Sequence, residues 1–199
     1  MCGIVGYIGN KDAYPILING LKKLEYRGYD SSGIMLYDKK ASIKKAKGKV
    51  SDLEVLYKNE KEQKGCIGIG HTRWATHGPP NKINSHPHLS NSGDLSLIHN
   101  GIIENYDALK AILHKKGYLF KSETDSEVLV NLIEEVKKTK KVKLGKAVRL
   151  ALKQVVGAYA IVVFDSTNPT EIVTAKLGSP LAIGVGDSEY YIGSDPSPF

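Results

Sequence analysis

The chain begins with an apolar stretch, Met1-Cys2-Gly3-Ile4-Val5-Gly6, which predicts a buried strand over residues 2–8. If the initiator methionine is removed, as the small side chain of Cys2 should allow, residue 2 carries both a thiol and the N-terminal α-amino group. An α-amino group has a pKa of about 7.7–8.0 and can accept the thiol proton, so Cys2 would combine a nucleophile with its own base. The alternative is that Cys2 is simply a small apolar residue at the start of a buried strand.

The remaining strands and helices come in groups along the chain. Strands are predicted at 34–37, 42–46, 66–71, 95–99, 158–164, 171–175, 181–185 and 189–192, and amphipathic helices at 12–26, 51–59, 105–116, 124–136 and 144–155. Capping boxes, Ser51 to Glu54 and Thr124 to Glu127, begin two of these helices. Grouping of this kind favours an α+β fold with largely antiparallel sheets, packed face to face with helices outside.

The size and composition are those of one ordinary globular domain, or at most two small ones. The 199 residues include 41% hydrophobic and 25% charged residues, and no apolar run is long enough to cross a bilayer. Lys11 and Asp12 interrupt the apolar N-terminus too early for a signal peptide. The two cysteines, Cys2 and Cys66, are too few for a disulfide framework, so we expect a cytoplasmic enzyme, and a bridge between them is undecided.

The net charge of +7 is concentrated in two lysine-rich stretches, residues 39–49 and 137–146. Such stretches could bind nucleic acid or another anionic surface. They contain no interleaved aromatic residues and no nucleic-acid motif accompanies them, so a solvated face is the favoured interpretation, with neither nucleic acid nor a membrane as a partner.

Three loops place polar groups just after an apolar strand or at a helix start. Arg73 follows the 66–71 strand, and its guanidinium suits bidentate capture of a carboxylate; a surface ion pair is the alternative. Asn100 and Gly101 offer two N–H donors for a developing oxyanion, but Asn-Gly is also a strong signal for a hairpin turn. Asp125 could bind an ammonium group or only complement a helix dipole.

Four histidines, His71, His77, His86 and His88, invite a metal interpretation. Their spacing matches no standard zinc template, so we expect no metal and no cofactor. A metal- or anion-binding module that uses these histidines and the lysines stays the non-enzymatic alternative, and it predicts tight zinc binding and indifference to changes at Cys2.

Five segments taken in order carry a resemblance to a known family. They are Cys2-Gly3-Ile4-Val5-Gly6, Leu24-Glu25-Tyr26-Arg27-Gly28-Tyr29-Asp30-Ser31, Gly70-His71-Thr72-Arg73-Trp74-Ala75-Thr76-His77-Gly78, His99-Asn100-Gly101 and Ser122-Glu123-Thr124-Asp125-Ser126-Glu127. Together they resemble the class II glutamine amidotransferase domain of the N-terminal nucleophile type. The resemblance extends from residue 2 to Ser194-Asp195, and it implies a four-layer α/β/β/α sandwich.

The resemblance implies a catalytic role for three residues. Cys2 would attack the side-chain amide of L-glutamine, with its own α-amino group as proton acceptor, to form a glutamyl thioester. Asn100 and Gly101 would hold the tetrahedral oxyanion, and water would then release glutamate. Arg73 would bind the α-carboxylate of glutamine and Asp125 its α-ammonium group.

Four more residues receive roles from the same resemblance. Thr76 and His77 would line the glutamine pocket, and Arg27 would support it from a neighbouring loop. Trp74 would be the gate between this pocket and an ammonia passage.

The resemblance also places residues 1–199 as a glutaminase domain that is incomplete at its C-terminus. The motif variants are closest to the branch of the family whose C-terminal isomerase region binds fructose 6-phosphate, and the full-length protein is expected to be a homodimer. That region is not in this sequence, so we expect glutamine hydrolysis alone from the chain. The purine-pathway phosphoribosyl enzymes and the asparagine synthetases are the alternatives within the class.

Overall fold

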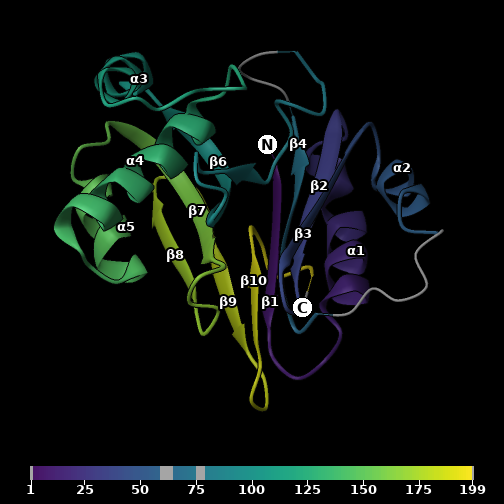
Figure 1. The fold of residues 1–199 in the computed structure, drawn as a ribbon. Helices are drawn as coiled ribbons and strands as arrows, with labels where there is room; N and C mark the ends of the chain where they lie inside the picture. The colour runs from purple at the N-terminus through teal and green to yellow at the C-terminus, as the bar shows by residue number, and fades with distance from the viewer. Residues whose placement is uncertain (1, 59–64, 75–78, 199) are drawn as a thin grey trace. The chain divides into compact units, whose positions relative to one another are not determined.

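The computed structural model describes residues 2–58, 65–74 and 79–198 (Figure 1). Contacts group the chain into two compact units. The first unit comprises Met1–Pro87 with Pro180–Phe199, and the second comprises His88–Ser179. Each unit contains one antiparallel sheet with its own helices, and each is described by itself.

The first unit is built on a six-stranded sheet in the order β3-β2-β4-β1-β10-β9. Its strands are β1 (Gly3–Ile8), β2 (Ser31–Tyr37), β3 (Ala41–Lys47), β4 (Ile67–Arg73), β9 (Ala182–Val185) and β10 (Tyr190–Gly193). The N-terminal strand β1 lies inside the sheet, with β4 on one side and β10 on the other. The predicted buried strand over residues 2–8 is therefore confirmed, and residue 2 immediately precedes a central strand.

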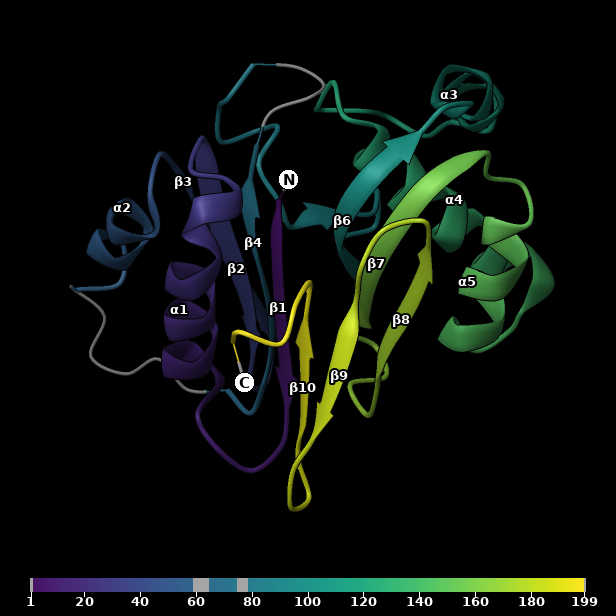
Figure 2. The same cartoon turned by 180° about the vertical axis from the view of Figure 1, so that it is seen from behind.

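One face of this sheet is covered by α1 (Ala13–Leu24), which is continued by the 3-10 turn η1 (Glu25–Arg27) (Figure 2). Leu17, Leu21 and Leu24 recur at helical spacing and are fully buried against the sheet. Pro15 lies in the first turn of α1, where a missing N–H costs no hydrogen bond.

The second helix of this unit, α2 (Val50–Val55), begins earlier than predicted. Ser51 was expected to cap it, and that prediction is wrong. The backbone N–H of Lys49 donates to Asp52 Oδ2 at 2.9 Å, so the helix begins at Val50 and the acidic residue that closes the turn is Asp52.

The second unit is built on a four-stranded sheet in the order β5-β6-β7-β8. Its elements are β5 (His88–Leu89), β6 (Leu95–Ile103), α3 (Tyr106–Lys115), α4 (Asp125–Lys140), α5 (Leu144–Leu152), β7 (Gly157–Asp165) and β8 (Ile172–Leu177). The helix α4 packs on β6 and against both α3 and α5. Thr124 caps α4 as predicted, since its side chain accepts a hydrogen bond from the Glu127 N–H.

The α+β, mostly antiparallel prediction is confirmed, and each unit is one helix layer on one sheet. The stacking of the two sheets into a four-layer sandwich stays a prediction. Two local details differ from expectation. The short strand β5 was not predicted, and β6 continues through Asn100 and Gly101 to Ile103, paired with β7 throughout.

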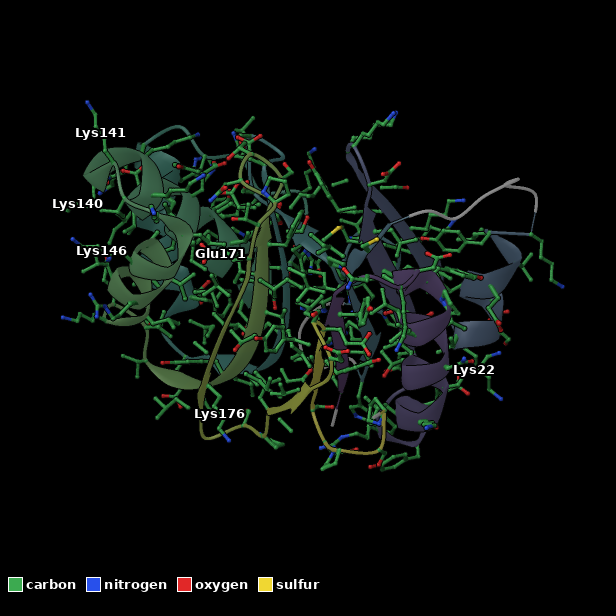
Figure 3. All side chains as sticks on the ribbon, turned by 90° about the horizontal axis from the view of Figure 1, so that it is seen from below. Lys22, Lys140, Lys141, Lys146, Glu171 and Lys176 are labelled. Atoms are coloured by element: carbon green, nitrogen blue, oxygen red, sulfur yellow. The ribbon has the colours of Figure 1, made fainter. Side chains whose placement is uncertain are left out.

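The lysine-rich stretch at 137–146 lies at the end of α4 and the start of α5. Lys137 pairs with Asp165 at 2.5 Å and Lys138 with Glu134 at 3.3 Å. Lys140, Lys141 and Lys146 are exposed, and their side chains extend away from the two helices (Figure 3). This arrangement agrees with the solvated face that the sequence favours. None of the described helices is long and apolar enough to span a membrane.

Candidate active site

The predicted site residues are divided between the two units. Cys2, Arg27, Arg73 and Trp74 belong to the first unit, whereas Asn100, Gly101 and Asp125 belong to the second. Thr76 and His77 lie outside the described residues.

The thiol of Cys2 is held by the main chain of Trp74. The Trp74 N–H donates to Cys2 Sγ at 3.2 Å, and the thiol donates to the Trp74 carbonyl oxygen at 3.5 Å. The pairing of β1 with β4, in which Gly3 lies opposite Thr72, brings these two segments together. Cys2 is therefore a half-buried thiol that contacts the main chain of Trp74 just before a buried strand.

Burial raises the pKa of the Cys2 thiol above its ordinary value. The hydrogen bond from the Trp74 N–H and the positive charge of Arg73 act in the opposite direction and only partly offset this effect. The thiol is consequently protonated near neutral pH, and a proton acceptor is required to make it a nucleophile.

Arg73 ends β4 and precedes Trp74, whose main chain contacts the Cys2 thiol, and it is buried. Its guanidinium donates to the carbonyl oxygen of Pro79 at 3.3 Å, and its backbone carbonyl accepts from the Asp30 N–H at 3.0 Å. Arg73 is only 4% exposed, so its guanidinium does not lie on the surface, where the ion pair considered from the sequence would have placed it.

The indole ring of Trp74, in contrast, is 48% exposed. It meets the half-exposed ring of Tyr29 edge to face, with 5.8 Å between the ring centroids. The main chain of Trp74 thus contacts the Cys2 thiol, while its side chain is exposed beside a second aromatic ring. The sequence did not suggest this pair of rings.

Gly28 sets the path of the chain at Trp74. A Cβ atom added at Gly28 would lie 2.7 Å from the carbonyl carbon of Arg73 and 2.8 Å from the backbone nitrogen of Trp74. Contacts this short with backbone atoms require the backbone to move. Gly28 therefore constrains the backbone that contacts the Cys2 thiol. It was not among the predicted site residues, although it follows Arg27 directly in the sequence.

Gly28→Ala is expected to displace the Arg73–Trp74 backbone and weaken both hydrogen bonds to Cys2 Sγ. Because the bond from the Trp74 N–H lowers the thiol pKa, alkylation of Cys2 should require a higher pH in the variant. Any turnover that depends on the Cys2 thiol should fall about 100-fold, as for a misplaced reacting group. Gly145→Ala is the matched control, since a Cβ there meets nothing within 4 Å. An unchanged alkylation profile in Gly28→Ala would contradict this assignment.

Arg27 is anchored to the far end of the chain. Its guanidinium pairs with Asp195 Oδ2 at 2.5 Å, and Tyr26 donates to the same oxygen at 2.8 Å. Burial raises the pKa of Asp195, but hydrogen bonds from the Ser197 residue, Tyr26 and Arg27 outweigh it and lower the pKa from 3.8 to about 2. Arg27 therefore holds the C-terminal segment against η1, and its support of the glutamine pocket stays a prediction.

This cluster predicts a pH dependence of stability. A carboxyl group whose pKa is lower in the folded state stabilises the fold above its unfolded pKa of about 4, and this contribution is lost as the pH falls from about 4 towards 2. The melting temperatures of wild type and Asp195→Asn should differ at pH 6 and converge near pH 2. A difference that stays constant over this range would contradict the assignment.

In the second unit, Asn100 and Gly101 lie within β6, opposite Ala160 and Tyr159 of β7. The hairpin turn considered from the sequence is therefore wrong at this place. Gly101 has a φ of 131°, and a Cβ added to it would collide with the carbonyl oxygen of Ala158. Only glycine permits this close approach of the two strands.

Asp125 is the first residue of α4, and its carboxylate is buried. The backbone N–H of Ile103, at the end of β6, donates to Asp125 Oδ2 at 2.8 Å. This bond connects the start of α4 to the strand that carries Asn100 and Gly101. Helix-dipole stabilisation of the carboxylate is compatible with this position and does not by itself account for its link to β6.

The histidines have structural partners in each unit. His71 and His86 are buried and their rings are in contact, with 4.1 Å between the centroids and 39° between the ring planes. His88 Nε2 lies 3.1 Å from Thr124 Oγ1, at the cap of α4. Among the residues that the structure describes, no group of three or more histidine, cysteine or acidic side chains could hold a metal ion. Both cysteines are described and they form no disulfide.

Comparison with known proteins places the chain in a family. The model of the glutamine amidotransferase domain matches residues 57–198. The chain therefore belongs to the glutamine amidotransferase domain family.

Three of the most similar proteins extend this result. The chain is 56% identical over 200 residues to the glutamine--fructose-6-phosphate aminotransferase (isomerizing) of Bacteroides thetaiotaomicron, covering 100% of the chain and 32% of that protein. It is 54% identical to the enzyme of the same name from Chlorobaculum tepidum, covering 100% of the chain and 33% of the protein. The chain thus spans about a third of the length of these relatives.

The third is a solved structure, the glutamine phosphoribosylpyrophosphate amidotransferase of B. subtilis complexed with ADP and GMP. It aligns with a TM-score of 0.84 at 30% identity, covering 100% of this chain and 43% of that one. The fold class is thus that of a class II glutamine amidotransferase.

Proposed function

We propose that this chain hydrolyses the side-chain amide of L-glutamine, with Cys2 as the nucleophile. The observation that carries the proposal is the half-buried Cys2 thiol at the start of a central strand, with its sulfur between the N–H and the carbonyl oxygen of Trp74. Its raised pKa calls for a nearby base, and the α-amino group exposed by removal of Met1 is the nearest chemical candidate.

In the proposed reaction the α-amino group takes the thiol proton as Cys2 Sγ bonds to the amide carbon. Asn100 and Gly101 donate to the resulting oxyanion. The carbon–nitrogen bond then breaks, and the leaving nitrogen takes up the proton held by the α-ammonium group of Cys2. Ammonia departs, and a glutamyl thioester on Cys2 remains. Water then adds to the thioester, and glutamate and the thiol are released.

In the proposed complex, two charged side chains bind the oppositely charged groups on the α-carbon of glutamine. Arg73 would bind the α-carboxylate, and Asp125 the α-ammonium group. Thr76 and His77 would line the same pocket, and Arg27 would support it. Trp74, with its exposed indole, would act as the gate to an ammonia passage.

We further propose that the ammonia serves the conversion of fructose 6-phosphate to glucosamine 6-phosphate in a longer, cytoplasmic, homodimeric protein. Identities of 54–56% over the whole chain to two glutamine--fructose-6-phosphate aminotransferases support this assignment. The phosphoribosyl alternative is favoured less, because the solved amidotransferase of that type is 30% identical.

The test is glutamate release from L-glutamine by the protein with Met1 removed, as verified by intact mass. A reactive glutamine analogue should label Cys2, as located by peptide mass spectrometry. Glutamate release without dependence on Cys2, or absence of both turnover and labelling in processed protein, would refute the proposal.

A further inference from the structure

The proposed ammonium-binding carboxylate, that of Asp125, and two neighbouring side chains form a buried polar cluster in the second unit. The cluster consists of His99 of β6, which is 3% exposed, and Asp125 and Ser126 of α4, which are 5% and 1% exposed. His99 and Ser126 belong to the motifs that contain Asn100 and Asp125, but the proposed reaction gives them no role.

The cluster contacts both oxygens of the Asp125 carboxylate. Oδ2 accepts from the Ile103 N–H at 2.8 Å, and Ser126 Oγ lies 3.4 Å from Oδ1. The serine oxygen also lies 2.9 Å from His99 Nδ1. His99 Nδ1 is 3.9 Å from Asp125 Oδ2, too far for a direct hydrogen bond.

The chemistry of these groups favours one direction of donation. An ionised carboxylate only accepts, so the Ser126 hydroxyl must donate its hydrogen to Asp125 Oδ1. The serine oxygen can then accept from His99, which requires the imidazole tautomer with hydrogen on Nδ1. The result is a continuous series of hydrogen bonds that runs from His99 through Ser126 to Asp125.

These hydrogen bonds restrict the orientation of the Asp125 carboxylate. Without them a carboxylate rotates easily about its last side-chain torsion, which has a broad energy minimum. One hydrogen bond, from Ile103, fixes a single oxygen. A second bond, to the other oxygen, fixes the plane of the group. The direction of the remaining lone pairs, which would meet a bound cation, depends on that plane.

We propose that Ser126 is a positioning residue of the ammonium subsite, and that His99 orients its hydroxyl. This inference rests on the proposed glutaminase function, in which Asp125 binds the α-ammonium group of glutamine. Ser126 thereby contributes to selection of amides that carry an α-amino group. It does not touch the reacting amide.

The test compares two substrates in the processed protein. For Ser126→Ala, the KM for L-glutamine is expected to rise about 10-fold with kcat changed less than about twofold, as for loss of a hydrogen bond that orients a charged group. For glutaramate, the analogue that lacks the α-amino group, kcat/KM should be equal in wild type and variant. Ser126→Thr, which keeps the hydroxyl, should restore the KM for glutamine.

Ser96→Ala is the matched control. Ser96 is a buried serine of the same strand, β6, and its hydroxyl makes no hydrogen bond with the described residues, so its removal should leave both substrates unaffected. Thermal unfolding verifies that all variants are folded at the assay temperature.

Results other than the expected one overturn either the positioning role of Ser126 or the glutaminase function itself. An unchanged KM for glutamine in Ser126→Ala, or equal losses with glutamine and glutaramate, would overturn the positioning role while leaving the glutaminase function intact. Wild-type protein that releases no glutamate would overturn the proposed function and this inference with it.

Discussion

Cys2→Ala is expected to abolish glutamate release, with a loss of at least about 10⁴-fold, as when a catalytic nucleophile is removed. Alanine keeps the small apolar character that the start of β1 requires. It removes only the sulfur that accepts from the Trp74 N–H and donates to the Trp74 carbonyl oxygen. The measurement is glutamate formation per enzyme, with ammonia determined in parallel.

Cys66→Ala is the natural comparison, because Cys66 is exposed and forms no disulfide with Cys2. It should retain wild-type turnover. Retained Met1 should reproduce the Cys2→Ala defect, since residue 2 then has no α-amino group to accept the thiol proton. Activity that persists in Cys2→Ala, or that is lost equally in Cys66→Ala, would exclude Cys2 as the sole nucleophile.

Gly101→Ala is expected to have the largest effect on the fold. The new methyl group would collide with the carbonyl oxygen of Ala158, and the φ of 131° is unfavourable for any residue with a side chain. The two central strands of the second sheet, β6 and β7, would have to separate at this point. We expect a loss of about 3 kcal/mol in the free energy of unfolding.

Denaturant unfolding of Gly101→Ala measures this loss. Gly145→Ala again serves as the control, because it adds the same methyl group in open space. If the variant is still folded at low temperature, its glutamate release should remain impaired, because the substitution displaces the backbone N–H of Gly101, the proposed oxyanion donor. Wild-type stability and turnover would show that the strands tolerate a side chain here.

Local patterns in the sequence were sufficient for the element types. Leu17, Leu21 and Leu24 predict α1 because side chains on one face of a helix recur every three or four residues. Thr124 predicts the start of α4 because its hydroxyl satisfies a backbone N–H within the same turn. Both depend only on neighbours in the chain.

Asn100 and Gly101 show where local reasoning stops. The pair has the composition of a turn, yet both residues are held in β6 by pairing with Ala160 and Tyr159 of β7, which lie 60 and 58 positions further along the sequence. The partner strand supplies the hydrogen bonds that decide between turn and strand. No short stretch of sequence contains that information.

The sequence by itself determined an α+β chain with five amphipathic helices and a strand at the N-terminus, and it indicated Cys2 as the candidate nucleophile. Only the tertiary structure decided which groups surround the candidate residues. Trp74 meets Cys2 across 72 positions, and Asp195 meets Arg27 across 168. Periodicity and capping act within a few residues, whereas these contacts depend on strand order and sheet register, so they become visible only once the chain is folded.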